Sequence, residues 1–151
     1  MRAVLDPNVL VSAVISPAGP PGSILLVWSL GQFELVISPK LLDELADVLA
    51  RPKLRRWVSQ ATASEYLDAL AESATMIDDP PDPPKRSADP DDDYLLALLD
   101  AADADYLVSG DPHLTGLAEH DVPVQTPSVF LARLLAEDLP DEPPSVKPDP
   151  R

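Results

Sequence analysis

The sequence predicts one α/β domain, with a central parallel β-sheet flanked by α-helices. Short apolar runs, as at residues 3–5, 33–37 and 106–108, alternate with longer stretches of helical spacing. This alternation is typical of strand–helix–strand units, and continuous apolar runs are typical of parallel strands buried on both faces. Apolar residues make up 45% and charged residues 25% of the 151 residues, a normal balance for a globular protein.

In the first half of the chain we expect strand, helix, helix, strand and helix, at residues 3–5, 9–15, 23–30, 33–37 and 39–50. Prolines and glycines at 16–22 separate the first two helices. Gly31 stands where a helix commonly ends. Ser38 followed by Pro39 is a helix start, because serine caps the first turn and proline fits its first position.

In the second half we expect helices, strands and a proline-rich loop in this order: helices 53–58 and 62–74, strand 75–77, loop 78–92, helix 93–103, strand 106–108, a weak strand 122–124 and a helix from 127. From Glu137 the chain is polar and broken by prolines. We therefore expect a folded domain over residues 1–136 and an acidic, disordered tail over 137–151.

The composition of the chain excludes several classes of function. The chain has no cysteine, which excludes disulfides, thiolate metal sites and thiol catalysis. No apolar run approaches the roughly 18–20 residues that cross a bilayer, and Asp6 comes too early for a signal peptide. A cytoplasmic protein without a membrane contact is the expectation. The net charge of −15 argues against broad, nonspecific binding of nucleic acids.

Acidic residues stand at the ends of the predicted elements. Asp6 follows the first strand and Asp111 follows the strand at 106–108, so both lie at the carboxyl edge of a parallel sheet, where sites form. Glu44 lies in the first turns of a helix, and Asp91–Asp93 begin another. Carboxylates that meet at one place repel one another unless a hard cation such as Mg²⁺ or Mn²⁺ neutralises them. Such a cluster therefore suggests metal-assisted phosphate chemistry.

Each acid also has a simpler explanation. Asp6 is suited to capping the next helix, and Asp111 after Gly110 is suited to a turn. Glu44 and Asp91–Asp93 stand near helix starts, where the helix dipole favours acids. Spacing alone does not establish that they converge.

Several segments of the sequence, taken in order, resemble PIN-domain ribonucleases, and in particular the VapC-like toxins of toxin–antitoxin pairs. The opening Val4–Ala13, VLDPNVLVSA, resembles the first motif of the family, and SPKLLDEL at 38–45 resembles the segment that carries its second acid. DPDDDYLLA at 89–97 and ADYLVSGD at 104–111 resemble its second half. The resemblance covers roughly residues 1–135.

The resemblance implies a single PIN-like domain, an Mg²⁺- or Mn²⁺-dependent ribonuclease activity and roles for particular residues. The catalytic and metal-binding residues would be Asp6, Glu44, Asp93 and Asp111. The supporting residues would be Asn8, Asp92 and Ser109. Pro7 departs from the threonine that is common in the family, which alters the hydrogen bonding beside the metal. The implied partners are an RNA substrate, a cognate antitoxin and a second copy of the chain in a homodimer.

Four of the eleven basic residues lie together, just beyond the helix that carries Glu44: Arg51, Lys53, Arg55 and Arg56. With Trp57 beside them they form a candidate RNA-binding segment, because single-stranded RNA is held by positive charge and stacking. The alternative is a solvated helix surface with Trp57 packed inward.

Two other functions remain possible at this point. A catalytically inactive PIN-like module that binds protein or RNA would keep the acids only as helix caps, and divalent-ion binding distinguishes it from an enzyme. A phosphotransferase of the haloacid-dehalogenase type also begins with a strand and an aspartate. That class normally has a second aspartate two residues later, where this sequence has Asn8.

Overall fold

The computed structural model describes residues 1–87, 89 and 92–138. Its centre is a five-stranded sheet in the order β3-β2-β1-β4-β5, in which every neighbouring pair is parallel. The strands are β1 (Arg2–Leu5), β2 (Glu34–Ile37), β3 (Thr75–Met76), β4 (Tyr106–Val108) and β5 (Val124–Gln125). The predicted α/β class with a central parallel sheet is confirmed.

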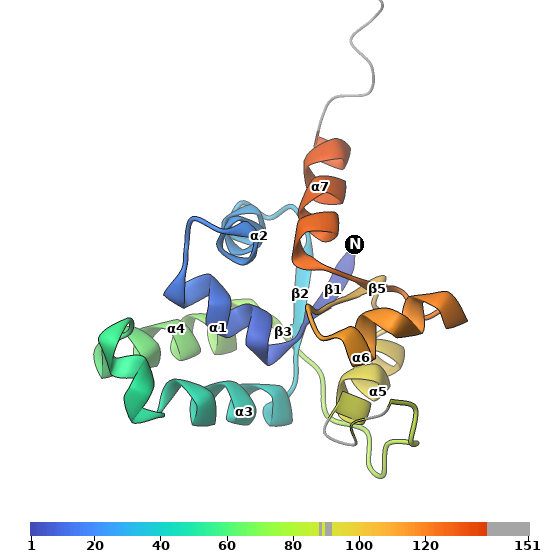
Figure 1. Ribbon diagram of the computed structural model, residues 1–151, viewed down its shortest axis with the longest axis horizontal. Helices are drawn as coiled ribbons and strands as arrows, with labels where there is room; N and C mark the ends of the chain where they lie inside the picture. Colours follow the sequence, from blue (N-terminus) through green and yellow to red (C-terminus); the bar gives the residue numbers. More distant parts are fainter. Residues whose placement is uncertain (88, 90–91, 139–151) are drawn as a thin grey trace, which may run out of the picture.

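The helices connect the strands in the manner of an α/β fold. They are α1 (Pro7–Ile15), α2 (Pro20–Ser29), α3 (Pro39–Leu49), the 3-10 helix η1 (Pro52–Arg56), α4 (Gln60–Ser73), α5 (Asp93–Ala101), α6 (Pro112–Thr115), the 3-10 helix η3 (Gly116–His120) and α7 (Pro127–Asp138). In Figure 1, α1–α4 lie to one side of the sheet, and α5 and α6 lie to the other.

The core lies between the sheet and these helices. β1 is buried from Ala3 to Leu5, and the buried residues of α5 pack over β1 and β4. Phe130 fixes α7 to the domain, because its ring meets Phe33 edge-on with ring centroids 5.4 Å apart. α1, which directly follows β1, packs against α2 and α3 and is thereby fixed in position.

The order of the strands reverses between β1 and β4. The chain moves from β1 outward through β2 to β3, then returns through α5 to β4 on the other side of β1. In open parallel sheets this switch point leaves a crevice at the carboxyl ends of the two strands. β1 and β4 both end there, with Leu5 opposite Val108 in register.

The structure departs from the predicted elements mainly at their ends. α1 begins at Pro7 and α2 at Pro20, because proline is well accepted in the first turn of a helix. In place of the helix predicted at 53–58, the structure has the short 3-10 helix η1 at Pro52–Arg56. The short helices α6 and η3 were not predicted. The tail predicted from Glu137 is helical to Asp138, and residues 139–151 lie outside the described part of the chain.

Among the described helices, none is by itself long and apolar enough to cross a membrane. α1 and α2 reach that length and apolarity only when they are counted together, and a bend of 94° separates them.

Candidate active site

A cavity of about 360 Å³ opens at the switch point between β1 and β4. We call it the acid cavity, and its lining residues are Asp6, Pro7, Asn8, Glu44, Asp47, Val48, Arg51, Asp89, Asp92, Leu95 and Asp111. The lining thus includes six carboxylates and one basic side chain. It brings together residues from the ends of β1 and β4, from α3 and from the start of α5.

Asp6 is fixed by two hydrogen bonds at the end of β1. Its Oδ1 accepts from the backbone N–H of Asn8 at 2.9 Å, which caps α1, and its Oδ2 accepts from the Ser109 hydroxyl at 2.9 Å. Burial raises the pKa of Asp6 and the nearby Asp111 raises it further, although the two hydrogen bonds act in the opposite direction. Asp6 therefore caps a helix and also lines the cavity.

Asp111 has the same double placement at the end of β4. Its Oδ1 accepts from the backbone N–H of His113 at 2.9 Å and so caps α6. Its own N–H donates to the Ser109 hydroxyl at 3.0 Å. Ser109 is completely buried and therefore links the two acids through a single oxygen.

Asp92 is the cap residue before α5 and Asp93 is the first residue of the helix, yet the two side chains lie in different places. Asp93 does not line the acid cavity. Its Oδ1 accepts from the backbone N–H groups of Arg86 and Ser87, at 3.0 and 2.8 Å, and these bonds outweigh burial and lower its pKa. The expected meeting of Asp93 with Asp6, Glu44 and Asp111 is thus absent from the structure, because this carboxylate anchors the preceding loop.

Asp92, expected only to support the site, lies in the cavity instead. Burial, a hydrogen bond to the Asp111 carboxyl and the charges of Asp111, Asp6 and Asp89 together raise its pKa to about 7. Its Oδ2 is buried and has no hydrogen-bond partner within the described part of the chain. Near neutral pH this group is therefore poised between the acid and the carboxylate.

Glu44 is held from across the cavity by a tyrosine. The Tyr94 hydroxyl of α5 donates to Glu44 Oε2 of α3 at 2.8 Å, and the Tyr94 side chain is buried. Lys40, also in α3, contacts the same tyrosine: its ammonium lies 4.6 Å from the centroid of the Tyr94 ring. Burial and the adjacent Glu44 carboxylate raise the pKa of Tyr94, so its phenol keeps its proton and remains a donor.

The basic segment divides into different environments. Arg51 lines the acid cavity. The Arg55 guanidinium donates to the carbonyls of Leu49 and Val58, so two of its five N–H donors cap the end of α3. Arg56 stacks on Trp57, 5.0 Å from the ring centroid, and Trp57 is 57% exposed. Lys53 is exposed.

The donors of the acid cavity fit a divalent metal ion. All are carboxylate oxygens, the ligands that Mg²⁺ and Mn²⁺ prefer, and the buried, unsatisfied Oδ2 of Asp92 is a ready acceptor for a cation. Among the described residues, no three acidic or histidine side chains are already arranged as a metal site.

Three further residues of the site were not predicted. Asp47 follows Glu44 by three residues, a spacing that places both on one face of α3, so the helical pattern contained this signal. Asp89 lines the cavity from the loop before α5. Tyr94 resembles an ordinary core residue in the sequence, and its contact with Glu44 depends on the packing of α5 beside α3.

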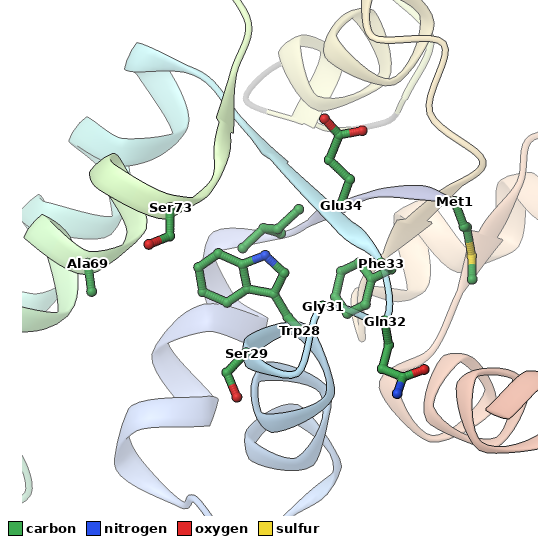
Figure 2. Close-up of a pocket in the computed structure, with 10 residues that line it drawn as sticks. Met1, Trp28, Ser29, Gly31, Gln32, Phe33, Glu34, Ala69 and Ser73 are labelled. Carbon is green, nitrogen blue, oxygen red and sulfur yellow. The ribbon is translucent and has the colours of Figure 1, made fainter.

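A larger cavity lies at the opposite, amino-terminal ends of β1 and β2 (Figure 2). It has a volume of about 700 Å³ and is lined by residues that include Trp28, Phe33 and Glu34. Glu34 is the one acid among the described lining residues. Its carboxylate accepts hydrogen bonds from Arg2 and Thr75 at 2.7 and 2.6 Å. The carboxylates that could take part in catalysis therefore lie in the smaller acid cavity.

A family model described as the PIN domain matches residues 2–113 of the chain. A curated relative is the uncharacterized protein MJ1680 of Methanocaldococcus jannaschii, which is 26% identical over 121 residues. That alignment covers 80% of this chain and 77% of the relative.

Two solved structures share the fold. PAE2754 from Pyrobaculum aerophilum superposes with a TM-score of 0.63 and 19% identity, over 90% of each chain. A chain of VapBC2 from Rickettsia felis, solved bound to a DNA fragment from their promoter, superposes with a TM-score of 0.60 and 15% identity. It covers 83% of this chain and 98% of the other.

Proposed function

Because the chain belongs to the PIN-domain family, whose members are generally nucleases, we propose that it is a metal-dependent endoribonuclease that hydrolyses RNA phosphodiester bonds. One observation carries the proposal. Asp6, Glu44, Asp92 and Asp111 come from four separate segments and line one cavity at the switch point of the sheet. Carboxylates placed close together repel one another and do not stabilise the fold. Their convergence is explained by a bound cation that takes part in a reaction.

The residues have distinct roles in this proposal. Asp6, Glu44, Asp92 and Asp111 hold one or two Mg²⁺ or Mn²⁺ ions, with Asp92 in the place that the sequence favoured for Asp93. When bound, the metal supplies charge for the scissile phosphate and lowers the pKa of a water molecule. Ser109 fixes the spacing of Asp6 and Asp111, and Tyr94 fixes the direction of the Glu44 carboxylate. Asn8 donates its backbone N–H to Asp6 and lines the cavity.

The phosphate backbone of the RNA is held by Arg51, because that side chain lies beside the carboxylates, with Lys53 and Arg56 further along the same segment. Trp57 offers an exposed ring on which a base can stack. Arg55 contributes less to this contact, because two of the five N–H donors of its guanidinium bind the carbonyls of Leu49 and Val58. Phosphate contacts of this kind are electrostatic and carry no sequence information.

We place the protein in the cytoplasm as the toxin of a toxin–antitoxin pair, restrained by a cognate antitoxin. The likeness in fold to the VapBC2 chain supports the proposed antitoxin partner. We also propose a homodimer, which covers four exposed side chains: Leu26 of α2, Leu30 at the end of α2, and Val129 and Leu135 of α7. α2 and α7 pack together, so these side chains belong to adjoining helices.

The proposal is tested with the purified protein and a fluorescent single-stranded RNA. Cleavage is expected with Mg²⁺ or Mn²⁺ and not with EDTA. The variant Arg51→Ala is expected to bind RNA more weakly at every sequence, with a flatter dependence on salt, by about 0.7 in slope for one phosphate contact. Absence of cleavage with either metal, together with no binding heat for Mn²⁺, contradicts the proposal.

The second candidate is a catalytically inactive PIN-like module. It is favoured by the capping of α1 and α6 by Asp6 and Asp111, because this structural role alone accounts for both acids. That module has no use for a metal. Calorimetry with Mn²⁺ in the absence of RNA therefore separates the two functions.

A further inference from the structure

A second cavity adjoins the acid cavity. Its volume is about 400 Å³, and its lining residues are Asn8, Val9, Ser12, Pro21, Gly110, Asp111, Pro112 and Pro127. We call it the proline cavity. Asn8 and Asp111 line both cavities, so whatever occupies one is in reach of the other.

The chemistry of the proline cavity differs from that of its neighbour. Its walls are mostly apolar, formed by Val9 and by prolines at the first turns of α2, α6 and α7. Among the described residues, Asp111 is the one charged residue of the lining, and no basic side chain lines the cavity. An RNA phosphate therefore gains nothing there, and the suitable occupant is neutral, with apolar surfaces and a polar edge.

The polar groups of the cavity suit such an occupant. The Ser12 side chain is exposed, and its hydroxyl makes no hydrogen bond to the part of the chain that the structure describes. A hydroxyl both donates and accepts, so it can pair with the edge of a ring. Pockets of this size and mostly apolar lining, with a few polar groups, are typical of small-ligand sites.

From this arrangement we propose that the proline cavity holds the base of the nucleotide next to the cleaved phosphate and so sets the base preference of the enzyme. The inference rests on the proposed ribonuclease function, because the phosphate at the acid cavity is what brings a base within reach. Apolar walls receive the faces of the base, as in other base-binding pockets, and Ser12 receives its edge.

Gly110 gives a sharp way to fill the cavity. A Cβ at this position meets no atom within 4 Å, and its φ lies outside the left-handed region, so a side chain enters open space without backbone strain. Gly116 is equally open but lines neither cavity, so it offers a matched control. Gly110→Val is therefore compared with Gly116→Val, and Ser12→Leu fills the same space from the α1 side, away from the loop of Asp111.

The experiment measures kcat/KM for one RNA and for a set of copies in which a single abasic nucleotide is moved along the strand. The wild type is expected to lose about tenfold at one position beside the cleaved bond, a typical value for an apolar pocket. Gly110→Val and Ser12→Leu are expected to lose about tenfold on the intact RNA and nothing further on that abasic copy. Gly116→Val is expected to match the wild type, and Mn²⁺ affinity to be unchanged in all three variants.

Several outcomes overturn the inference while leaving the ribonuclease proposal intact. One is a wild type that cleaves RNA but tolerates an abasic nucleotide at every position. Another is an equal abasic loss in wild type and Gly110→Val. A third is RNA kinetics unchanged in both filled variants while binding of a partner protein weakens, which would assign the cavity to a protein. A wild type that cleaves none of the RNAs overturns the ribonuclease proposal itself, and the base site with it.

Discussion

The two ends of the sheet treat acidic side chains in opposite ways. At the amino-terminal end, Glu34 lies in the larger cavity, and its hydrogen bonds to Thr75 and Arg2 lower its pKa. At the carboxyl end, burial and neighbouring acids raise the pKa of Asp6 and bring that of Asp92 to about 7. The first carboxylate stabilises the fold, and the others oppose it. In this protein, cavity size is therefore a poorer guide to function than whether the carboxylates in a cavity are paired with donors or with other acids.

The sharpest test of this comparison replaces one acid at each end. Asp6→Asn is expected to reduce RNA cleavage at least about 100-fold, the order seen when one electrostatic group of a catalytic site is removed. Asparagine can still cap α1, so circular dichroism is expected to show an intact fold. Glu34→Gln is the control and should cleave RNA as the wild type does. Equal cleavage by all three proteins would assign the chemistry to another place.

Metal binding should stabilise the carboxyl end and depend on pH. At about 100 times the dissociation constant, Mn²⁺ is expected to add about 2–3 kcal/mol to the free energy of unfolding. A ligand must lose its proton before it binds a metal, so the added stability is larger at pH 8 than at pH 6, across the pKa of Asp92. Melting curves with and without Mn²⁺ measure this. A gain in melting temperature that is the same at both pH values would argue against Asp92 as a ligand.

Tyr94 should act on the metal through Glu44. Tyr94→Phe keeps the ring below Lys40 but removes the hydroxyl that binds Glu44 Oε2. Mn²⁺ affinity is expected to fall about tenfold, as for other groups that orient a metal ligand. The control is Tyr106→Phe, at the other end of the sheet, where the ring packs on Phe130. Calorimetry that finds the same Mn²⁺ affinity in both variants would leave Tyr94 as a packing residue only.

The smallest effect concerns the metal-free protein. Because the pKa of Asp92 is raised in the folded state, its ionisation costs stability as pH rises from about 4 through 7. Asp92→Asn removes this cost and is expected to raise the melting temperature by about 1–3 °C at pH 8, with little change at pH 4. Glu34→Gln is not expected to raise it at either pH, since that group's pKa is lowered. A lower melting temperature for Asp92→Asn would mean that this carboxylate supports the fold.

The fold and the positions of two acids were accessible from the sequence for a simple reason. Short apolar runs specify parallel strands, and an acid that directly follows such a run must emerge at the carboxyl edge. Asp6 and Asp111 are of this kind, and both line the acid cavity. The strand order that makes neighbours of β1 and β4 is not visible in the spacing, so their convergence needed either the family resemblance or the structure.

The exchange of Asp93 for Asp92 shows where such reasoning stops. Successive residues of a helix point about 100° apart, so a shift of one residue turns a side chain out of a cavity. Which of the two faces inward depends on Arg86 and Ser87, whose N–H groups hold Asp93. Arg55 is a second example, because the sequence does not reveal that its guanidinium donates to the carbonyls of Leu49 and Val58.

The capping bonds of Asp6 and Asp111 bear on how the protein can change by mutation. Each aspartate is followed by the proline that begins a helix, and each carboxylate accepts the N–H two residues on. Alanine at either position removes a cap as well as an acid, at about 1 kcal/mol of folding stability. Asparagine or serine removes the acid alone. Only a few substitutions of Asp6 or Asp111 therefore remove the acid and keep the folding stability. Most other substitutions at these two positions remove the acid and also destabilise the domain.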